Sequence, residues 1–293
     1  MTSFKSFKES YTPRIDQQLS DQIMSIEAPI ILKEAMNYSL VAGGKRVRPL
    51  FLLAVLDFLK VNHEEALAVG STIEMVHTYS LIHDDLPSMD NDDFRRGQLT
   101  NHKVYGEALA ILAGDGLLTY SFGVLARLKE VSAEDKLELI NLLSKASGAE
   151  GMVGGQVLDI ESERKIVTVD ELETIHINKT GALLSFSIEA GAILAKTNPN
   201  IRNALTDFGF HIGLAFQIQD DILDIEGTTE ELGKTAGKDV ASEKNTYPAL
   251  LTLNGAKDKR DFHYNQAILS LRQISDEPGL LDEMAAYIVN RSK

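Results

Sequence analysis

The chain of 293 residues contains no cysteine and no tryptophan. The absence of cysteine rules out a disulfide framework and removes the thiolate ligands that zinc and copper favour. It also fits a reducing compartment, so we expect a cytoplasmic protein. Basic residues are in the minority, with 29 lysines and arginines against 43 aspartates and glutamates and a net charge of −14. This balance argues against broad nucleic-acid binding, which needs a basic face.

Long apolar runs are also missing. The best two are Leu50 to Leu59 and Leu109 to Leu118, and each contains an aspartate and is too short to cross a bilayer. The N-terminal sequence has no apolar core of the signal-peptide type. We therefore expect no membrane span.

Sustained alternation of apolar and polar residues is absent, so strands should be few or missing. Apolar residues recur instead at three- and four-residue steps, which predicts helices along almost the whole chain. Two charged segments with glycine, 42–49 and 227–248, interrupt the pattern, and neither resembles an inter-domain linker. Asp170 is expected to cap the helix that starts at residue 169. The expected helical ranges are 15–26, 30–40, 50–59, 64–83, 104–129, 135–148 running on to 160, 169–194, 201–225, 261–274 and 280–291.

The most informative stretch is Leu81 to Gly97, which reads LIHDDLPSMDNDDFRRG. Carboxylates at this density cannot all ionise cheaply without a cation. Pro87 is expected to end the preceding apolar helix, which places the first two aspartates near a helix C-terminus, where the macrodipole also disfavours negative charge. The segment is either a solvated acidic loop or a hard-cation site with an anion clamp beside it. The charged residues concerned are Asp84, Asp85, Asp90, Asp92, Asp93, Arg95 and Arg96.

A second acidic cluster, FQIQDDILD at 216–224, favours the cation site. Asp220 and Asp224 are four residues apart and share one helix face, with Asp221 beside them. The surrounding residues are apolar, which is unusual for a solvated stripe. Two such clusters facing each other across a cavity would hold several divalent cations, and oxygen ligands favour Mg²⁺.

Basic residues occur near both clusters. Lys45 and Arg48 follow a glycine pair just before a helix, where backbone N–H groups and cations could bind phosphate. Lys179 and Thr180 interrupt an apolar region, and the segment 227–248 is long enough to be a binding loop or lid. His77 lies two helical turns before the first acidic cluster, although a lone histidine there can also be a satisfied core residue. Together these features predict a ligand with a diphosphate head and an apolar tail.

The motifs closely resemble those of the trans-polyprenyl diphosphate synthases, and within them the bacterial-type farnesyl diphosphate synthases. The resemblance covers nearly the whole chain, and the motifs occur in order. One departure is Leu99, where relatives commonly have proline. The matching segments are GGKRVRP at Gly43, SLIHDDLPSMDNDDFRRG at Ser80, NHKVYGEALAILAGDGLL at Asn101, GMVGGQVLDI at Gly151, KTGALL at Lys179, FQIQDDILD at Phe216, LGKTAGKD at Leu232 and KNTYPALL at Lys244.

This resemblance implies an all-α fold, a single domain over residues 1–293 forming a helical bundle around a deep central cavity, and a homodimer. It implies a reaction that joins isopentenyl diphosphate to dimethylallyl or geranyl diphosphate and gives farnesyl diphosphate, with about three Mg²⁺ ions per active site. It assigns the metal to Asp84, Asp90 and Asp220, and a wider catalytic set adds Asp85, Asp221, Asp224 and Lys179. The implied allylic site is Arg95, Lys179, Thr180, Gln217, Lys234 and Lys244, and the implied isopentenyl site is Lys45, Arg48, His77 and Arg96.

Product length and several rival functions stay open at this stage. Tyr79 is the better candidate for the floor of the cavity, and the smaller Ser80 lies next to it. A geranyl or geranylgeranyl diphosphate synthase would share nearly all the motifs. The second aspartate motif and the GGKRVRP segment argue against a terpene cyclase. A non-catalytic regulatory subunit of a prenyl synthase is disfavoured because both aspartate motifs are intact. The spacing of a calcium-binding EF-hand is absent.

Overall fold

The computed structural model describes residues 3–163, 165–226 and 245–291. In these ranges the chain is almost entirely helical, with one short hairpin, which confirms the predicted all-α class. The elements are α1 (Phe4–Met24), α2 (Ile30–Val41), α3 (Val47–Phe58), α4 (Ala66–Asp84), β1 (Phe94–Arg95), β2 (Gln98–Leu99), α5 (Asn101–Tyr105), α6 (Glu107–Ala126), α7 (Ala133–Ser147), α8 (Met152–Ser162), α9 (Val169–His176), the π-helix η1 (Ile177–Gly181), α10 (Ala182–Leu194), α11 (Pro199–Glu226), α14 (Tyr247–Arg272) and α15 (Leu280–Asn290).

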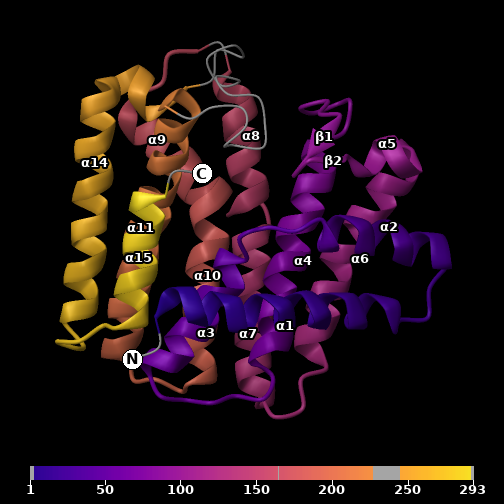
Figure 1. Ribbon diagram of the computed structural model, residues 1–293, viewed down its shortest axis with the longest axis horizontal. Coiled ribbons are helices and arrows are strands. Elements are labelled where there is room, and N and C mark those ends of the chain that lie inside the picture. The colour runs from indigo at the N-terminus through magenta and orange to yellow at the C-terminus, as the bar shows by residue number, and fades with distance from the viewer. Residues whose placement is uncertain (1–2, 164, 227–244, 292–293) are drawn as a thin grey trace.

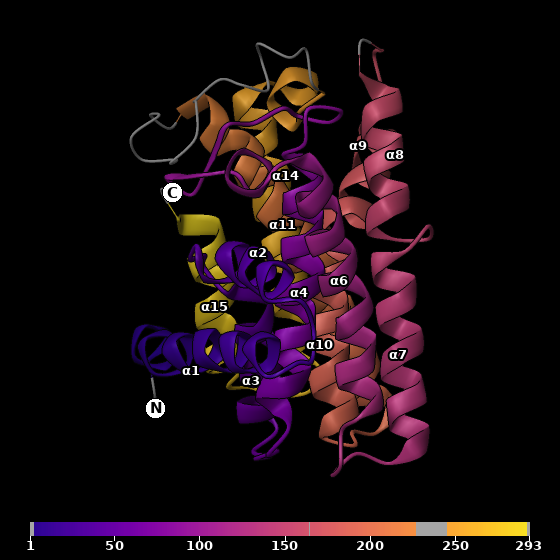
Figure 2. The same ribbon diagram turned by 90° about the vertical axis from the view of Figure 1, so that its right-hand side faces the viewer.

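The helices α4, α6, α7 and α10 stand side by side, α8 follows α7 nearly end to end, and α1 and α2 run across the bundle (Figure 1, Figure 2). The helix α4 packs against α3 and α6, while α10 joins α3 to α11. On the other side α11 packs along α14 and α15. One large cluster of buried apolar side chains runs through this bundle, and a smaller one lies between α9, α11 and α14. The expectation of a single domain over residues 1–293 stays a prediction.

The helix α3 explains how the bundle forms from the sequence. Its residues from Leu50 to Leu56 are apolar and buried on every side, because α4 and α10 cover it. A helix that is apolar all round is stable only inside a protein. Burying one large apolar side chain contributes about 1.5–3 kcal/mol, so α3 is a principal source of stability.

Several expected helix boundaries are wrong. The run expected over 104–129 breaks at Gly106, whose φ of 84° ends α5 before α6 begins. The run expected from 135 to 160 breaks between α7 and α8. The cap of α9 is Thr168 and not Asp170. The Thr168 hydroxyl accepts a hydrogen bond from the Glu171 N–H, and the Glu171 carboxylate accepts one from the Thr168 N–H. This reciprocal pair satisfies two N–H groups at the helix start, which a cap at position 170 could not do.

The helix α6 has an unusual surface. By length and composition it could cross a membrane, although the buried helices of folded proteins often meet the same criterion. Two observations favour a packed helix: α6 contains Asp115, and it lies along α4. It nevertheless presents apolar side chains outward, with Leu112 55% exposed and Ile111 43% exposed. A partner of some kind is therefore expected on this face.

Candidate active site

A cavity of about 810 Å³ lies at the C-terminal end of α4. Six parts of the chain meet there: the start of α3 with the turn before it, the end of α4 with its hairpin, α6, α8, the π-helix η1 and α11. They bring acidic, basic and apolar side chains to one place. The expected site residues that line this cavity are Lys45, Arg48, His77, Tyr79, Ser80, Asp84, Arg95, Arg96, Lys179, Thr180, Gln217 and Asp220.

The first acidic cluster contributes Asp84 to the cavity wall. Asp84 is the last residue of α4, and its side chain lines the cavity at this end of the helix. Its pKa is raised to about 6, chiefly by burial; the charge of Lys179 opposes this shift, and the charge of Asp90 adds to it. Asp90 is exposed and is tied to the end of the helix because its N–H donates to the Asp84 carbonyl over 2.8 Å. The carboxylate of Asp84 is thus held where it lacks full counter-charge.

The second acidic cluster contributes Asp220, which α11 carries into the same cavity. Its Oδ1 lies 2.7 Å from a guanidinium nitrogen of Arg291. The Arg291 side chain is buried, donates to the Phe216 carbonyl over 3.0 Å and stacks on the Phe216 ring. The sequence did not suggest this arginine, because it follows α15 and lies outside every acidic or basic motif.

Asp85, Asp221 and Asp224 do not line the cavity. Asp85 binds Arg95 in a bidentate pair, with Nη2 2.5 Å from Oδ1 and Nε 2.9 Å from Oδ2, which holds Arg95 at the rim. Asp221 accepts the Tyr247 N–H over 3.0 Å and an amide hydrogen of Gln217 over 3.3 Å. It thereby ties α11 to the start of α14. Asp224 is buried on α11. Any catalytic role for these three aspartates remains a prediction.

The basic side of the cavity is built from two tight turns. The turn before α3 has positive φ at Gly43, Gly44 and Arg46, and it presents Lys45 and Arg48 to the cavity. The hairpin of β1 and β2 has a two-residue loop, Arg96 and Gly97, with φ of 53° and 76°. These values are typical of a type I′ hairpin turn. Arg96 then donates a hydrogen bond to the Gly43 carbonyl, so the two turns support each other.

The electrostatics of this side favour an anion. Burial lowers the pKa of His77 well below its ordinary value, and the charges of Arg48 and Arg96 lower it further. His77 is therefore neutral at pH 7 and can either donate or accept a hydrogen bond. Burial also lowers the pKa values of Arg48 and Arg96, because the cations lack solvent. A phosphate-bearing anion would supply the negative charge that these two neighbouring arginines require, and His77 could add a hydrogen bond.

The π-helix η1 carries Lys179 and Thr180 into the opposite wall. A π-turn inside a longer helix is rare and occurs often at functional sites. The Lys179 ammonium lies 2.5 Å from Asp159 on α8, a partner that the sequence did not indicate. The backbones of α8 and η1 also lie close together at Gly155, because this residue has no side chain. A Cβ there would lie 2.2 Å from the Lys179 backbone nitrogen.

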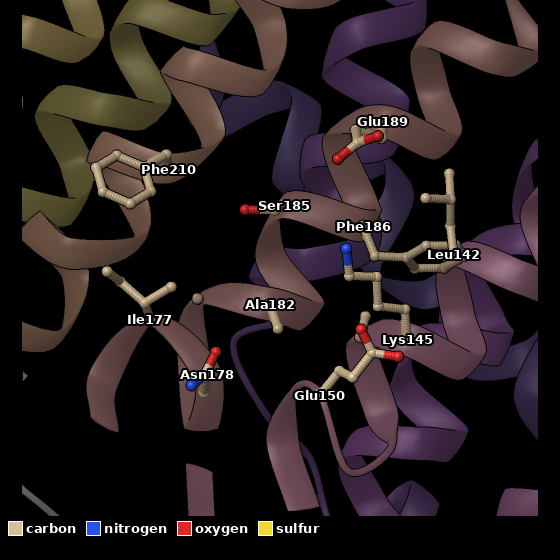
Figure 3. Close-up of a pocket in the computed structure, with 12 residues that line it drawn as sticks. Leu142, Lys145, Glu150, Ile177, Asn178, Ala182, Ser185, Phe186, Glu189 and Phe210 are labelled. Carbon is tan, nitrogen blue, oxygen red and sulfur yellow. The ribbon is translucent and has the colours of Figure 1, made fainter. Parts of the chain in front are cut away.

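A second pocket of about 230 Å³ lies on the other face of the same π-helix. Ile177 and Asn178 face it from η1, Phe210 comes from α11, and Lys145 and Glu150 stand at its edge (Figure 3). The short π-turn therefore separates the two spaces.

Lys234 and Lys244, the remaining expected ligands of the allylic substrate, lie outside the described residues. The sequence also did not single out His83, which lines the cavity, donates a hydrogen bond from Nε2 to the Ile111 carbonyl over 3.1 Å and makes an edge contact with the Tyr79 ring. Its place directly before the aspartate pair is the signal that could have found it.

The described residues contain no group of three acidic, histidine or cysteine side chains converging on one point. Single carboxylates fit Mg²⁺, which uses one or two carboxylates and completes its shell with water and substrate phosphates. Asp84 and Asp220 approach the cavity from two helices and offer such single carboxylates. The donor set consists of oxygen atoms only, so the residues fit Mg²⁺.

The chain matches the family model described as Polyprenyl synthetase over residues 29–277. It is 51% identical to the farnesyl diphosphate synthase of Bacillus subtilis, with 98% of this chain and 97% of that protein covered. It is 52% identical to the farnesyl diphosphate synthase of Geobacillus stearothermophilus, with 99% and 98% covered. The solved structure of an FPP/GFPP synthase from Zymomonas mobilis superposes with a TM-score of 0.88 at 40% identity, over 98% of this chain and 99% of that one.

Proposed function

Because this chain belongs to the polyprenyl synthetase family, we propose that it is a Mg²⁺-dependent prenyltransferase that condenses isopentenyl diphosphate with dimethylallyl or geranyl diphosphate. The observation that carries the proposal is the single cavity in which two carboxylates, Asp84 and Asp220, face two separate basic groups. One basic group is Lys45, Arg48, His77 and Arg96, and the other is Lys179 with Thr180. Two groups of this kind suit two diphosphates.

In the proposed reaction the C–O bond of the allylic diphosphate breaks and the diphosphate leaves with the electron pair. The double bond of isopentenyl diphosphate attacks the resulting allylic cation, which forms the new C–C bond. A proton then passes from the isopentenyl unit to the released diphosphate. Asp84, Asp90 and Asp220 would hold about three Mg²⁺ ions, which would supply Lewis-acid stabilisation of the leaving group.

The protein's own groups orient the substrates and exclude water. Lys179 and Arg95 hold charge beside the leaving diphosphate, where negative charge develops. Arg48 and Arg96 fix the second diphosphate, and neutral His77 donates a hydrogen bond without adding charge. Leu86, Met152 and Phe216 supply an apolar wall, which protects the cation from water. The described residues need to supply no nucleophile and no strong base.

We further propose that the product is farnesyl diphosphate, with fifteen carbons. Tyr79 is almost fully buried, lines the cavity and lies five residues before Asp84 on α4, about 7.5 Å along the helix axis. A chain that is anchored at Asp84 and grows along α4 meets this ring. The relatives at about 50% identity are farnesyl diphosphate synthases, while a geranylgeranyl diphosphate synthase of Capsicum annuum is 46% identical over 87% of this chain.

We also propose a cytoplasmic homodimer. The support is the exposed apolar face of α6 and α8, which includes residues of the cavity wall itself: Ile111 and Val157 line the cavity and are 43% and 51% exposed. A second copy of the chain on this face would cover them. The alternative, a membrane surface, is disfavoured by the net charge of −14.

The experiment is an assay with geranyl diphosphate, isopentenyl diphosphate and Mg²⁺ that measures both diphosphate release and the prenyl product by chromatography. We expect a fifteen-carbon product with the wild-type chain and loss of most turnover for Asp84→Asn and Asp220→Asn. The matched control is Asp93→Asn, because Asp93 belongs to the same acidic motif but pairs with Lys103 away from the cavity. Diphosphate release without coupling would reject the prenyltransferase and favour a cyclase.

A further inference from the structure

The turn before α3 contains a buried arginine that does not reach the cavity. Arg46 is 2% exposed and has a φ of 51°, a left-handed conformation that residues other than glycine seldom adopt. Its neighbours Lys45 and Arg48 line the cavity, whereas Arg46 does not. The Arg46 side chain therefore lies in the core, while Lys45, one residue before it, and Arg48, two residues after it, lie at the site.

Three groups from three helices hold the Arg46 guanidinium. Nε donates to Asp16 on α1 over 2.8 Å, Nη1 donates to Glu74 on α4 over 2.8 Å, and Nη2 donates to the Leu40 carbonyl on α2 over 2.5 Å. The planar fork of arginine suits such an arrangement, and lysine would satisfy only part of it. The strained turn is thus clamped from three directions, which is what persistence of an unfavourable φ requires.

Glu74 connects this clamp to the cavity. It is 2% exposed and lies on α4 one helical turn before His77, a residue of the cavity wall. Besides its contact with Arg46, its charge raises the pKa values of Arg48 and Arg96 against the effect of burial. The same carboxylate therefore faces the buried clamp and the basic side of the site.

We propose that Arg46 and Glu74 are a positioning pair for the isopentenyl diphosphate subsite. Neither residue touches the substrate. Arg46 holds the turn that places Lys45 and Arg48 at the cavity. Glu74 binds Arg46 and lies on α4 with His77, so it holds this turn in position relative to His77. This inference rests on the proposed function, in which Lys45, Arg48, His77 and Arg96 bind isopentenyl diphosphate. The competing explanation is an ion pair that stabilises the fold and has no effect on the site.

The double variant Arg46→Met/Glu74→Met separates the two explanations. Replacing both members of a buried ion pair by apolar side chains of similar size is often neutral or stabilising, so the variant is expected to fold. It removes one positive and one negative charge, and the net charge near the subsite stays the same. A change in diphosphate binding therefore reports the loss of the pair and not a change in net charge.

Binding of isopentenyl diphosphate is measured by titration calorimetry in EDTA, which keeps the metal-dependent allylic site out of the measurement. Steady-state kinetics with Mg²⁺ then give KM for each substrate, and urea unfolding gives stability. We expect the double variant to bind isopentenyl diphosphate about tenfold more weakly, the loss of about one well-aligned charge-assisted contact. We expect KM for geranyl diphosphate to change less than twofold.

Two further variants make the outcome decisive. Arg48→Gln removes a direct contact, so unchanged isopentenyl diphosphate binding in that variant would reject the proposed subsite itself. If Arg48→Gln weakens binding but the stable double variant binds like wild type, the subsite stands and the positioning pair is wrong. Asp16→Asn is the milder control, since Asp16 is 40% exposed and contacts only Nε, and we expect less than a threefold effect. Equal changes in both KM values would also overturn the inference.

Discussion

At the scale of single residues, the site keeps a carboxylate in an environment that opposes its charge. Asp84 is largely buried, and its pKa of about 6 lies about two units above the ordinary value for aspartate. A raised carboxyl pKa in the folded state costs stability at pH values above it, because the unfolded chain ionises more readily. The metal-free protein is therefore less stable than it would be with a neutral group at this position.

We predict that Asp84→Asn stabilises the metal-free protein while it removes most turnover. A shift of about two pKa units corresponds to an increase of order 2 kcal/mol in the free energy of unfolding at pH 7. The folded-state pKa is the higher one, so the gain is complete above pH 6 and disappears as the pH falls toward 4. Urea unfolding in EDTA at pH 7.5 and pH 4.2 measures it.

The control for this prediction is Asp93→Asn, whose carboxylate is exposed and paired with Lys103. That pairing lowers the Asp93 pKa, so its replacement should give no gain at either pH. If Asp84→Asn is no more stable than wild type at pH 7.5, burial does not oppose the charge of Asp84, and the expectation that a cation is needed there loses its electrostatic support.

At the scale of secondary-structure elements, the sequence predicted the helices well and the contacts between them poorly. Apolar periodicity is a local property, so α4, α10 and α11 could be recognised from spacing alone. The motifs also marked most of the cavity wall. Arg291 and Asp159 were missed because each meets its partner only after separate helices have packed. The left-handed φ of Arg46 was equally inaccessible, since three distant helices impose it.

The helix α4 allows a prediction about product length. Tyr79 is 6% exposed on this helix, faces the cavity and makes an edge contact with His83. If its ring blocks the growing chain by excluded volume, Tyr79→Ala should give products of twenty carbons or more, with Mg²⁺ dependence retained. Loss of a buried aromatic side chain costs about 3–5 kcal/mol, so Tyr79→Leu is included as a less disruptive variant. Chromatography of the products measures the outcome.

Tyr120→Ala is the matched control, because this tyrosine lies on α6 outside the cavity wall and hydrogen-bonds to the Gln22 carbonyl. Its product should remain at fifteen carbons. Folded and active Tyr79 variants that still stop at fifteen carbons would show that another residue ends the chain, and the product assignment would then rest on the relatives alone.

At the scale of the whole molecule, the exposed apolar face of α6 predicts a dimer. Leu112→Asp places a charge on this face, where a partner would bury it, and burial of an unpaired charge is strongly unfavourable. We expect light scattering to give twice 32.2 kDa for wild type and 32.2 kDa for the variant. Leu269→Asp is the matched control: Leu269 is 52% exposed on α14, far in the bundle from α6, and its replacement should leave the dimer intact.

The Leu112→Asp variant also tests whether the reaction depends on the dimer. Ile111, next to Leu112, and Val157 are both in the cavity wall and both open to solvent when one chain stands alone. An allylic cation in a cavity with such a wall would be accessible to water. A monomeric Leu112→Asp chain should therefore release diphosphate from geranyl diphosphate and form a larger share of prenyl alcohol at the expense of coupled product. A monomer that couples its substrates as cleanly as wild type would mean that one chain excludes water by itself, and the exposed face of α6 would then need a different explanation.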